Sequence, residues 1–196
     1  MNSLDNSQFE GCNDLQSINL QGLYFDGLPL PPVWGTLPNL VDLFIYDCDI
    51  GGTLNNLIGI HPEQMWIDFN PLLSGTIPTE FGGSDNIQVL SYSFTENSLY
   101  GTIPTEFGDL LNLESFWVYR NYLNGAVPSE MAQLGRLKIF RTEENNLTGS
   151  MPSEICDISY KYKVLGSKCM HLGNNICACC NCCDAYACNA LDDTFY

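Results

Sequence analysis

Cysteines are the residues of this 196-residue chain with the most evident chemistry, because a thiol can form a disulfide or bind a soft metal ion as a thiolate. Eight of the ten crowd into one C-terminal stretch: Cys156, Cys169, Cys177, Cys179, Cys180, Cys182, Cys183 and Cys188. A stretch this short cannot build a hydrophobic core of its own, so we expect disulfides to hold it together. The sequence does not fix how these eight candidates pair.

The competing interpretation of the same stretch is a metal site. Cys177-x-Cys179-Cys180-x-Cys182-Cys183 is dense enough for several thiolates to share one soft ion. Structural zinc sites, however, place two C-x-x-C pairs on either side of a loop, and that spacing is missing here. We therefore expect disulfides and no metal site, with reactive thiols as the remaining alternative.

Histidines give no sign of a catalytic site. His61 and His171 lie in unrelated segments, and no second His, Ser or Cys is placed to complete a nucleophile–base pair with either. We expect the chain not to be an enzyme and to carry no cofactor.

The net charge limits the classes of partner that the chain can bind. The formal charge is -16 and the chain has only 7 Lys and Arg, so we expect neither nucleic acid nor an anionic membrane as a partner. Clustered carboxylates could associate weakly with divalent cations, although no D-x-D-x-D-G calcium loop is present. No apolar stretch approaches the roughly 18 residues of a membrane span, so we expect no membrane insertion in this segment. No signal peptide is visible at Met1.

The chain contains internal repeats, and these must position any functional site that it carries. The segment Gly75–Gly82 returns almost unchanged as Gly101–Gly108, and shorter copies start at Gly125 and Gly149. Together with Gly52, these glycines are separated by 23, 26, 24 and 24 residues. A period in the twenties predicts a solenoid, which offers an extended surface rather than a catalytic cleft.

One repeat shows the physical role of each position. It runs Leu110-x-x-Leu113-x-x-Phe116-x-Val118-x-x-Asn121-x-Leu123-x-Gly125-x-Val127-Pro128. The alternation at Phe116 and Val118 predicts a short strand with one buried face. Asn121 should satisfy backbone groups of its own and neighbouring coils, so that stacked Asn side chains form a ladder. In an earlier repeat Cys48 takes the Asn position, which predicts a buried free thiol.

These motifs resemble the leucine-rich repeat in its plant-type form, with an L-x-G-x-I-P tail. The resemblance covers residues 12–155. It implies an α/β fold: a right-handed solenoid with a parallel sheet on its concave face and irregular or 3₁₀ turns on its convex face. We expect an N-terminal cap region at 1–14, six leucine-rich repeats over 15–155, and a Cys-rich, disulfide-rich C-terminal cap at 156–196.

The Cys-rich cap carries a second resemblance. Cys169 followed by Cys177-Ala-Cys179-Cys180-Asn-Cys182-Cys183 looks like the C-terminal cap of secreted or cell-surface leucine-rich repeat proteins of diatoms. The resemblance implies an extracellular or cell-surface location, although no signal or anchor is present in this sequence. In that location Asn146, in Asn146-Leu147-Thr148, would be a candidate for N-glycosylation.

In two repeats the spacing is irregular, so the motif does not directly show which residues point inward. In the repeat that contains Asn70, we expect Met65 and Ile67 to point inward. In the next one, alignment from Asn86 makes Leu90 and Tyr92 the inward pair, whereas counting back from Asn97 makes it Tyr92 and Phe94. A shift of one residue turns every side chain to the other face, so the two alternatives predict different surfaces.

The residues that alternate with the inward ones are the candidate binding surface on the concave face: Asp42, Phe44, Tyr46, Trp66, Asp68, Trp117, Tyr119, Arg120, Arg141 and Glu143. Four of them, Phe44, Trp66, Trp117 and Tyr119, would form an aromatic band with carboxylates beside it. Rigid aromatics flanked by polar groups are typical of binding hot spots. The alternative is that they merely pack against neighbours on a pleated surface.

These observations favour an extracellular module that binds a protein, a peptide or a glycan on its concave face. A structural or adhesive matrix protein, whose acidic surface bridges cations, is the alternative. Removal of divalent cations would separate the two, because only adhesion depends on them.

Overall fold

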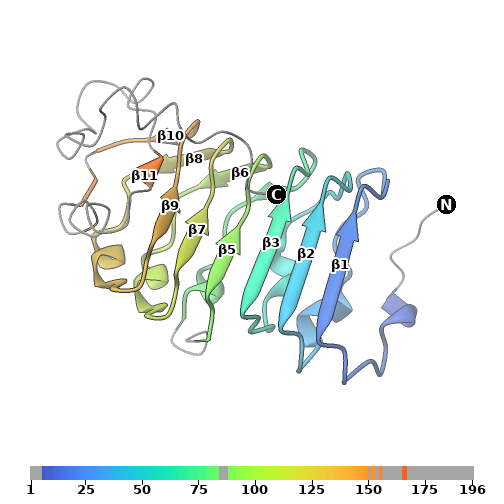
Figure 1. Ribbon diagram of the computed structural model, residues 1–196. Helices are drawn as coiled ribbons and strands as arrows, with labels where there is room; N and C mark the ends of the chain where they lie inside the picture. The colour runs from blue at the N-terminus through green and yellow to red at the C-terminus, as the bar shows by residue number, and fades with distance from the viewer. Residues whose placement is uncertain (1–5, 84–87, 150, 153–154, 156–164, 167–196) are drawn as a thin grey trace.

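The computed structural model describes residues 6–83, 88–149, 151–152, 155 and 165–166. Stacked coils each contribute one strand to a seven-stranded parallel sheet of order β1-β2-β3-β5-β7-β9-β11 (Figure 1). Its strands are β1 (Ser17–Gln21), β2 (Asp42–Tyr46), β3 (Gln64–Asp68), β5 (Ser91–Ser93), β7 (Ser115–Trp117), β9 (Ile139–Arg141) and β11 (Leu165–Gly166). The predicted solenoid with a parallel sheet is therefore confirmed.

Strand periodicity decides which side chains enter the core. Leu43, Met65, Tyr92, Phe116 and Phe140 lie in register across five strands, and all are buried. The expected inward pair Met65 and Ile67 is confirmed.

For the 26-residue repeat, Tyr92 and Phe94 are fully buried and Leu90 is only partly so. The count from Asn97 is correct and the alignment from Asn86 is wrong. The spacing from Tyr92 to Asn97 equals that from Phe116 to Asn121, so the extra residues of this repeat lie before its strand.

The predicted Asn ladder runs beside the sheet. The amide oxygen of Asn121 accepts the Leu99 N–H at 3.0 Å, and its amide nitrogen donates to the Phe94 carbonyl at 2.7 Å. Each Asn thus satisfies backbone groups of the preceding coil, where water cannot reach them. Cys48, at the equivalent position, is fully buried and unbonded to another cysteine among the described residues, as expected.

A second parallel sheet, of order β10-β8-β6-β4, follows the ladder and was not predicted. It consists of β4 (Ser74–Gly75), β6 (Ser98–Gly101), β8 (Tyr122–Gly125) and β10 (Asn146–Leu147). Each strand is so short that it gives no alternation in the sequence. Gly101 has φ +83°, and a Cβ there would come within 2.9 Å of Thr76 Cγ2, so only Gly allows the coils to stack this closely.

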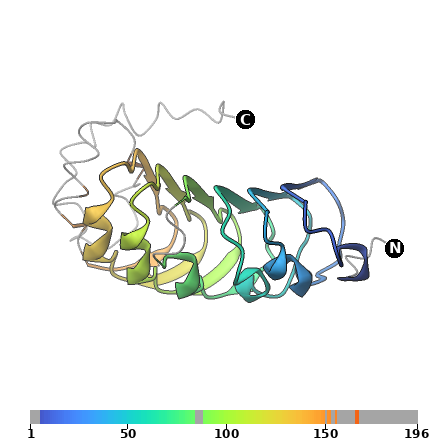
Figure 2. The ribbon, with the colours of Figure 1, turned by 90° about the horizontal axis from the view of Figure 1, so that it is seen from below.

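On the far side of the coils the described residues form short 3₁₀ turns, as expected (Figure 2). They are η1 (Asn6–Gln8), η2 (Pro32–Thr36), η3 (Leu54–Leu57), η4 (Thr79–Phe81), η6 (Thr105–Asp109) and η7 (Ser129–Gln133). Pro78, Pro104 and Pro128 stand directly before three of them, because proline fixes φ near the required value.

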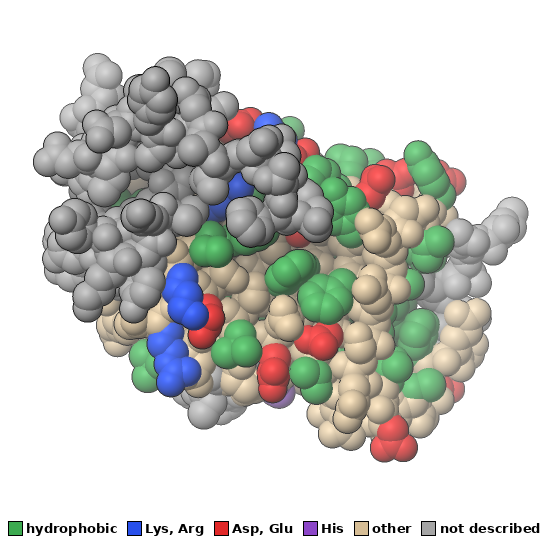
Figure 3. All heavy atoms as spheres, viewed as in Figure 1, with side chains coloured by type: hydrophobic (Ala, Val, Ile, Leu, Met, Phe, Trp, Pro, Cys, Tyr) green, Lys and Arg blue, Asp and Glu red, His purple; other side chains and the backbone are tan. Residues whose placement is uncertain are grey.

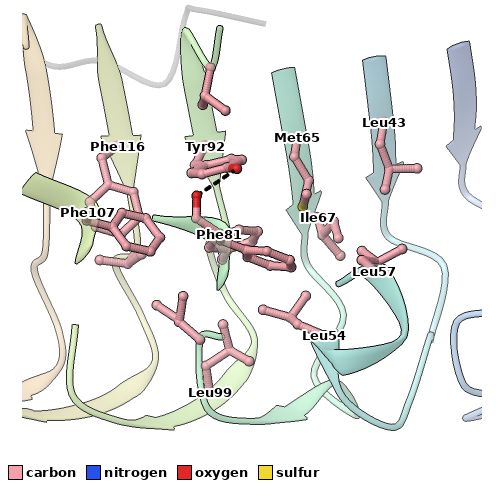
Figure 4. Close-up of a cluster of buried hydrophobic side chains, with 14 of the residues drawn as sticks. Leu43, Leu54, Leu57, Met65, Ile67, Phe81, Tyr92, Leu99, Phe107 and Phe116 are labelled. Carbon is pink, nitrogen blue, oxygen red and sulfur yellow. Dashed lines mark hydrogen bonds between the residues drawn. The ribbon is translucent and has the colours of Figure 1, made fainter. Parts of the chain in front are cut away.

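Aromatic side chains fill the space between the sheet and the 3₁₀ turns (Figure 4). Phe81, Tyr92 and Phe107 lie with neighbouring ring centroids 5.7–6.0 Å apart, and the Tyr92 hydroxyl donates to the Phe81 carbonyl at 3.2 Å. Burial of each such ring contributes roughly 2–3 kcal/mol. The sheet is thereby held rigidly from behind. None of the described helices is long and apolar enough to cross a bilayer.

Candidate functional site

The face of the seven-stranded sheet that points away from this core is called here the outer sheet face. Strand register aligns one residue per coil along its middle, in the order Asn19, Phe44, Trp66, Ser93, Trp117 and Arg141. This central row exists because alternate residues of a strand share a face and parallel strands keep equivalent positions side by side.

Three aromatic rings of the central row touch one another. Phe44 meets Trp66 edge to face, with centroids 5.2 Å apart and planes at 69°. Trp66 and Trp117 stack at 6.1 Å and 22°, although the strand β5 lies between theirs. Strands two apart are separated by roughly 9.6 Å. The two indoles therefore lean toward each other over Ser93, whose small side chain leaves them room.

Hydrogen bonds fix the orientation of this stack. Trp66 Nε1 donates to Ser91 Oγ at 2.8 Å, and Ser91 Oγ lies 2.7 Å from Ser115 Oγ. Trp117 Nε1 is buried without a hydrogen-bond partner in the part of the chain that the structure describes. Trp66 is 37% exposed, so a rigidly held indole faces solvent.

Basic side chains lie at the other end of the outer sheet face. The Arg141 guanidinium carbon is 4.4 Å from the centroid of the Tyr119 ring, and Arg141 Nε donates to Glu143 Oε1 at 3.1 Å. Arg120 is paired with both Glu96 and Glu144, one coil before and one coil after it. These contacts join successive coils through charge as well as through packing.

Two of the predicted binding residues, Asp68 and Glu143, are buried. Asp68 and Glu143 are each only 7% exposed, so neither carboxylate lies open on the surface. The Asp68 carboxylate accepts the Ser93 hydroxyl at 2.8 Å and the Thr95 N–H at 2.6 Å, and burial raises its pKa to about 7. Burial likewise raises the pKa of Glu143, against the opposing effect of Arg141.

The other predicted residues lie on or beside the outer sheet face. Asp42, Phe44, Tyr46, Trp117, Tyr119 and Arg141 are partly exposed, and Arg120 is exposed. Tyr119 is not in the central row but stands two residues beyond Trp117, beside Arg141. Asn146 is exposed, as a glycan acceptor must be. The eight disulfide candidates, Cys156 to Cys188, lie outside the described residues.

Sequence reasoning missed Ser91 and Ser93. They orient Trp66 and make room for the indole stack, yet serine by itself attracts no attention. The spacing to Asn97 was the signal that could have placed both on the outer sheet face.

Comparison with known proteins identifies the architecture. No family model matches the chain, and no curated protein matches it. Among solved structures, the chain is similar to the receptor in a PEPR1–AtPEP1 complex, with 29% identity, a TM-score of 0.64, and coverage of 84% of this chain and 22% of that one. A TDR receptor gives 28% identity, a TM-score of 0.66, and coverage of 78% and 26%.

A third similar structure is the leucine-rich repeat ectodomain of the Arabidopsis receptor kinase HAESA with an N-terminally extended IDA peptide hormone ligand. It shares 25% identity, with a TM-score of 0.56, and the match covers 74% of this chain and 23% of that one. The chain thus spans about a quarter of the length of the receptors it matches. Its fold is a leucine-rich repeat solenoid of the kind found in these receptor ectodomains.

Proposed function

We propose that the chain is an extracellular recognition module that binds an extended peptide, or an extended segment of a protein, on its outer sheet face. The observation that carries this proposal is the aromatic row of Phe44, Trp66 and Trp117, which the fold presents to solvent already oriented. The HAESA ectodomain, which has this fold, was solved with a peptide hormone ligand.

The physical case begins with preorganisation. A bound partner must offset the entropy of every side chain that it immobilises. Trp66 is already held by Ser91 and by the neighbouring rings, so little of that cost remains. Large rigid aromatics with a polar atom at one edge give much contact area for few rotatable bonds.

The length of the central row favours an extended partner. From Phe44 on β2 to Arg141 on β9 the row crosses four strand spacings, which amounts to roughly 19 Å. An extended peptide rises about 3.3 Å per residue, so about six residues would cover the row. A sugar ring could stack on the same indoles, and a glycan is therefore the second outcome that the test must recognise.

Location and caps belong to the same proposal. We place the module outside the cell or on its surface, with a cap region at 1–14, repeats over 15–155 and a disulfide-stapled cap at 156–196. The resemblance of the Cys-rich segment to diatom surface proteins supports this placement.

Selection from a random dodecapeptide library, run beside a glycan array, tests the function. Phe44→Ala and Trp66→Ala should weaken selected ligands at least tenfold while the thermal midpoint stays within a few degrees. Tyr122→Ala is the matched control, because Tyr122 is a 59% exposed aromatic on the second sheet. Ligands that bind all three variants alike would refute the outer sheet face as the site, and array hits without peptides would replace peptide by glycan.

A further inference from the structure

Charge is divided very unevenly along the solenoid. All seven Lys and Arg residues lie at position 120 or beyond, whereas fifteen of the 23 Asp and Glu residues precede it. The first coils therefore carry carboxylates with no basic side chain of their own. Figure 3 shows basic side chains only on the side of the molecule where β7 and β9 lie.

Three of the four basic side chains in the described part of the chain, Arg120, Lys138 and Arg141, are already paired with carboxylates. Arg120 is paired with Glu96 and Glu144, Arg141 with Glu143, and Lys138 Nζ lies 2.6 Å from Glu114. All of these carboxylates belong to the later coils. Asp42 and Asp47, which belong to the coil that holds β2, take part in none of these four pairs.

The two ends of the central row differ in charge in the same way. At its far end the chain's own Arg141 stands in register with Trp117 and stacks on Tyr119. At its near end no cation of the described residues lies over Phe44 or Trp66. Phe44 instead shares its face of β2 with Asp42, and Asp47 is exposed directly after the strand. In Figure 3 acidic side chains border the hydrophobic ones over this part of the sheet.

We infer that the near end of the central row, formed by Phe44 and Trp66 with Asp42 on the same face, binds a Lys or Arg side chain of the peptide. The inference rests on the proposed function and specifies its ligand. A cation is attracted to the face of an indole ring, and Trp gives the strongest such contact of the aromatic residues. The Asp42 carboxylate, which has no ion pair among the described residues, adds a charge that a basic ligand would neutralise.

The arrangement is the counterpart of the one that the chain uses internally. Arg141 has an aromatic ring below it and a carboxylate beside it. The Phe44–Trp66 end offers aromatic rings and carboxylates and lacks the guanidinium. A basic residue of the partner would complete that set, and it would also fix which end of the peptide lies over the first coils.

The test uses peptides selected from the random dodecapeptide library by the full chain. Those whose binding depends on Trp66 should contain Lys and Arg at least twice as often as the library. In the best binder, replacement of the critical Arg by citrulline, which has nearly the same shape and no charge, should weaken binding at least tenfold. On Asp42→Asn the penalty for citrulline should shrink to about threefold or less.

Asp109→Asn is the matched control, because it removes the same charge from an exposed position on η6. If Asp42→Asn and Asp109→Asn reduce the citrulline penalty equally, the peptide responds only to overall charge and the site is refuted. If Trp66-dependent peptides carry no excess of basic residues, or citrulline binds equally well, the inference falls and the proposed function stands. If no peptide depends on Trp66, the proposed function falls as well.

Discussion

The first and last coils of the same sheet share one interior and differ in their outer face. Leu43 on β2 and Phe116 on β7 occupy the same register row and are both fully buried. Outside, β2 and β3 present Asp42, Phe44 and Trp66, whereas the last coils present Arg120, Lys138 and Arg141, each paired with a carboxylate. The repeat motif constrains the residue types at inward positions, whereas the outward residues can differ from coil to coil and so can serve a function.

The two regions also differ in the ladder beside the sheet. Asn121 makes hydrogen bonds to an N–H and to carbonyls of two coils, whereas the Cys48 thiol, which has no amide, donates to the Tyr46 carbonyl at 3.3 Å. Burial raises the pKa of Cys48, so it remains a neutral thiol. The coil that holds β2 therefore has a weaker polar connection at this position.

The largest effect should come from removing the ladder. Asn121→Ala leaves the Leu99 N–H and the Phe94 carbonyl buried without partners. Each such group costs about 1–3 kcal/mol, so the free energy of unfolding should fall by about 3 kcal/mol or more. Cys48→Ala loses one weak bond and a small volume, and should cost about 1 kcal/mol. Urea denaturation measures both.

Asn124→Ala controls for the loss of an Asn from the same coil, because Asn124 is exposed. It should change stability by less than about 0.5 kcal/mol. Equal losses for Asn121→Ala and Cys48→Ala would mean that the ladder does not distinguish the two regions.

A second effect concerns Asp68, at the boundary between the regions. Its pKa is raised to about 7 because burial penalises the charged form, whereas the unfolded chain loses this proton near pH 4. The folded state thus holds the extra proton between pH 4 and 7. The contribution of Asp68 to the free energy of unfolding therefore falls as pH rises from about 4 to 7, and it is lost above pH 7.

Asp68→Asn removes this titration and keeps an oxygen for the Thr95 N–H. The stability of the variant relative to the native chain should therefore be greater at pH 8 than at pH 5, by about 2 kcal/mol. Thermal melts at the two pH values measure this difference, and the comparison with the native chain cancels the other carboxylates. An identical gap at both values would mean that Asp68 is charged in the folded protein throughout.

The difference between inward and outward residues also decides how much of this structure can be predicted from the sequence. Inward positions recur in every coil, so Leu113, Phe116 and Asn121 could be placed from spacing alone. The outer sheet face has no such recurrence. Its alternation places Phe44 and Trp66 on one face, but not the 6.1 Å stack of Trp66 on Trp117 across β5.

Burial of Asp68 and Glu143 escaped prediction for a related reason. Alternation assigns both to the outer sheet face, and charge suggests exposure. Asp68 is covered because Ser93 and Thr95, about 25 residues further along the chain, supply its hydrogen bonds. Such partners become visible only once the register between β3 and β5 is known. The second sheet was missed because its strands are too short to show periodicity.

The smallest predicted effect compares equivalent turn residues of the two regions. Asp47 and Arg120 both follow a strand with a left-handed backbone, at φ 51° and 55°. An Ala at either position meets the same backbone strain, so the difference between the two variants isolates the charge interactions.

Arg120→Ala loses its pairs with Glu96 and Glu144, whereas Asp47→Ala loses no ion pair among the described residues. Arg120 is half exposed and its pairs are screened, so Arg120→Ala should be less stable than Asp47→Ala by about 0.5–1 kcal/mol at low salt. The difference should disappear in about 1 M NaCl, where the Debye length is roughly 3 Å. Urea denaturation at the two salt concentrations measures it, and a difference that persists in high salt would mean that Arg120 joins the last coils by packing rather than by charge.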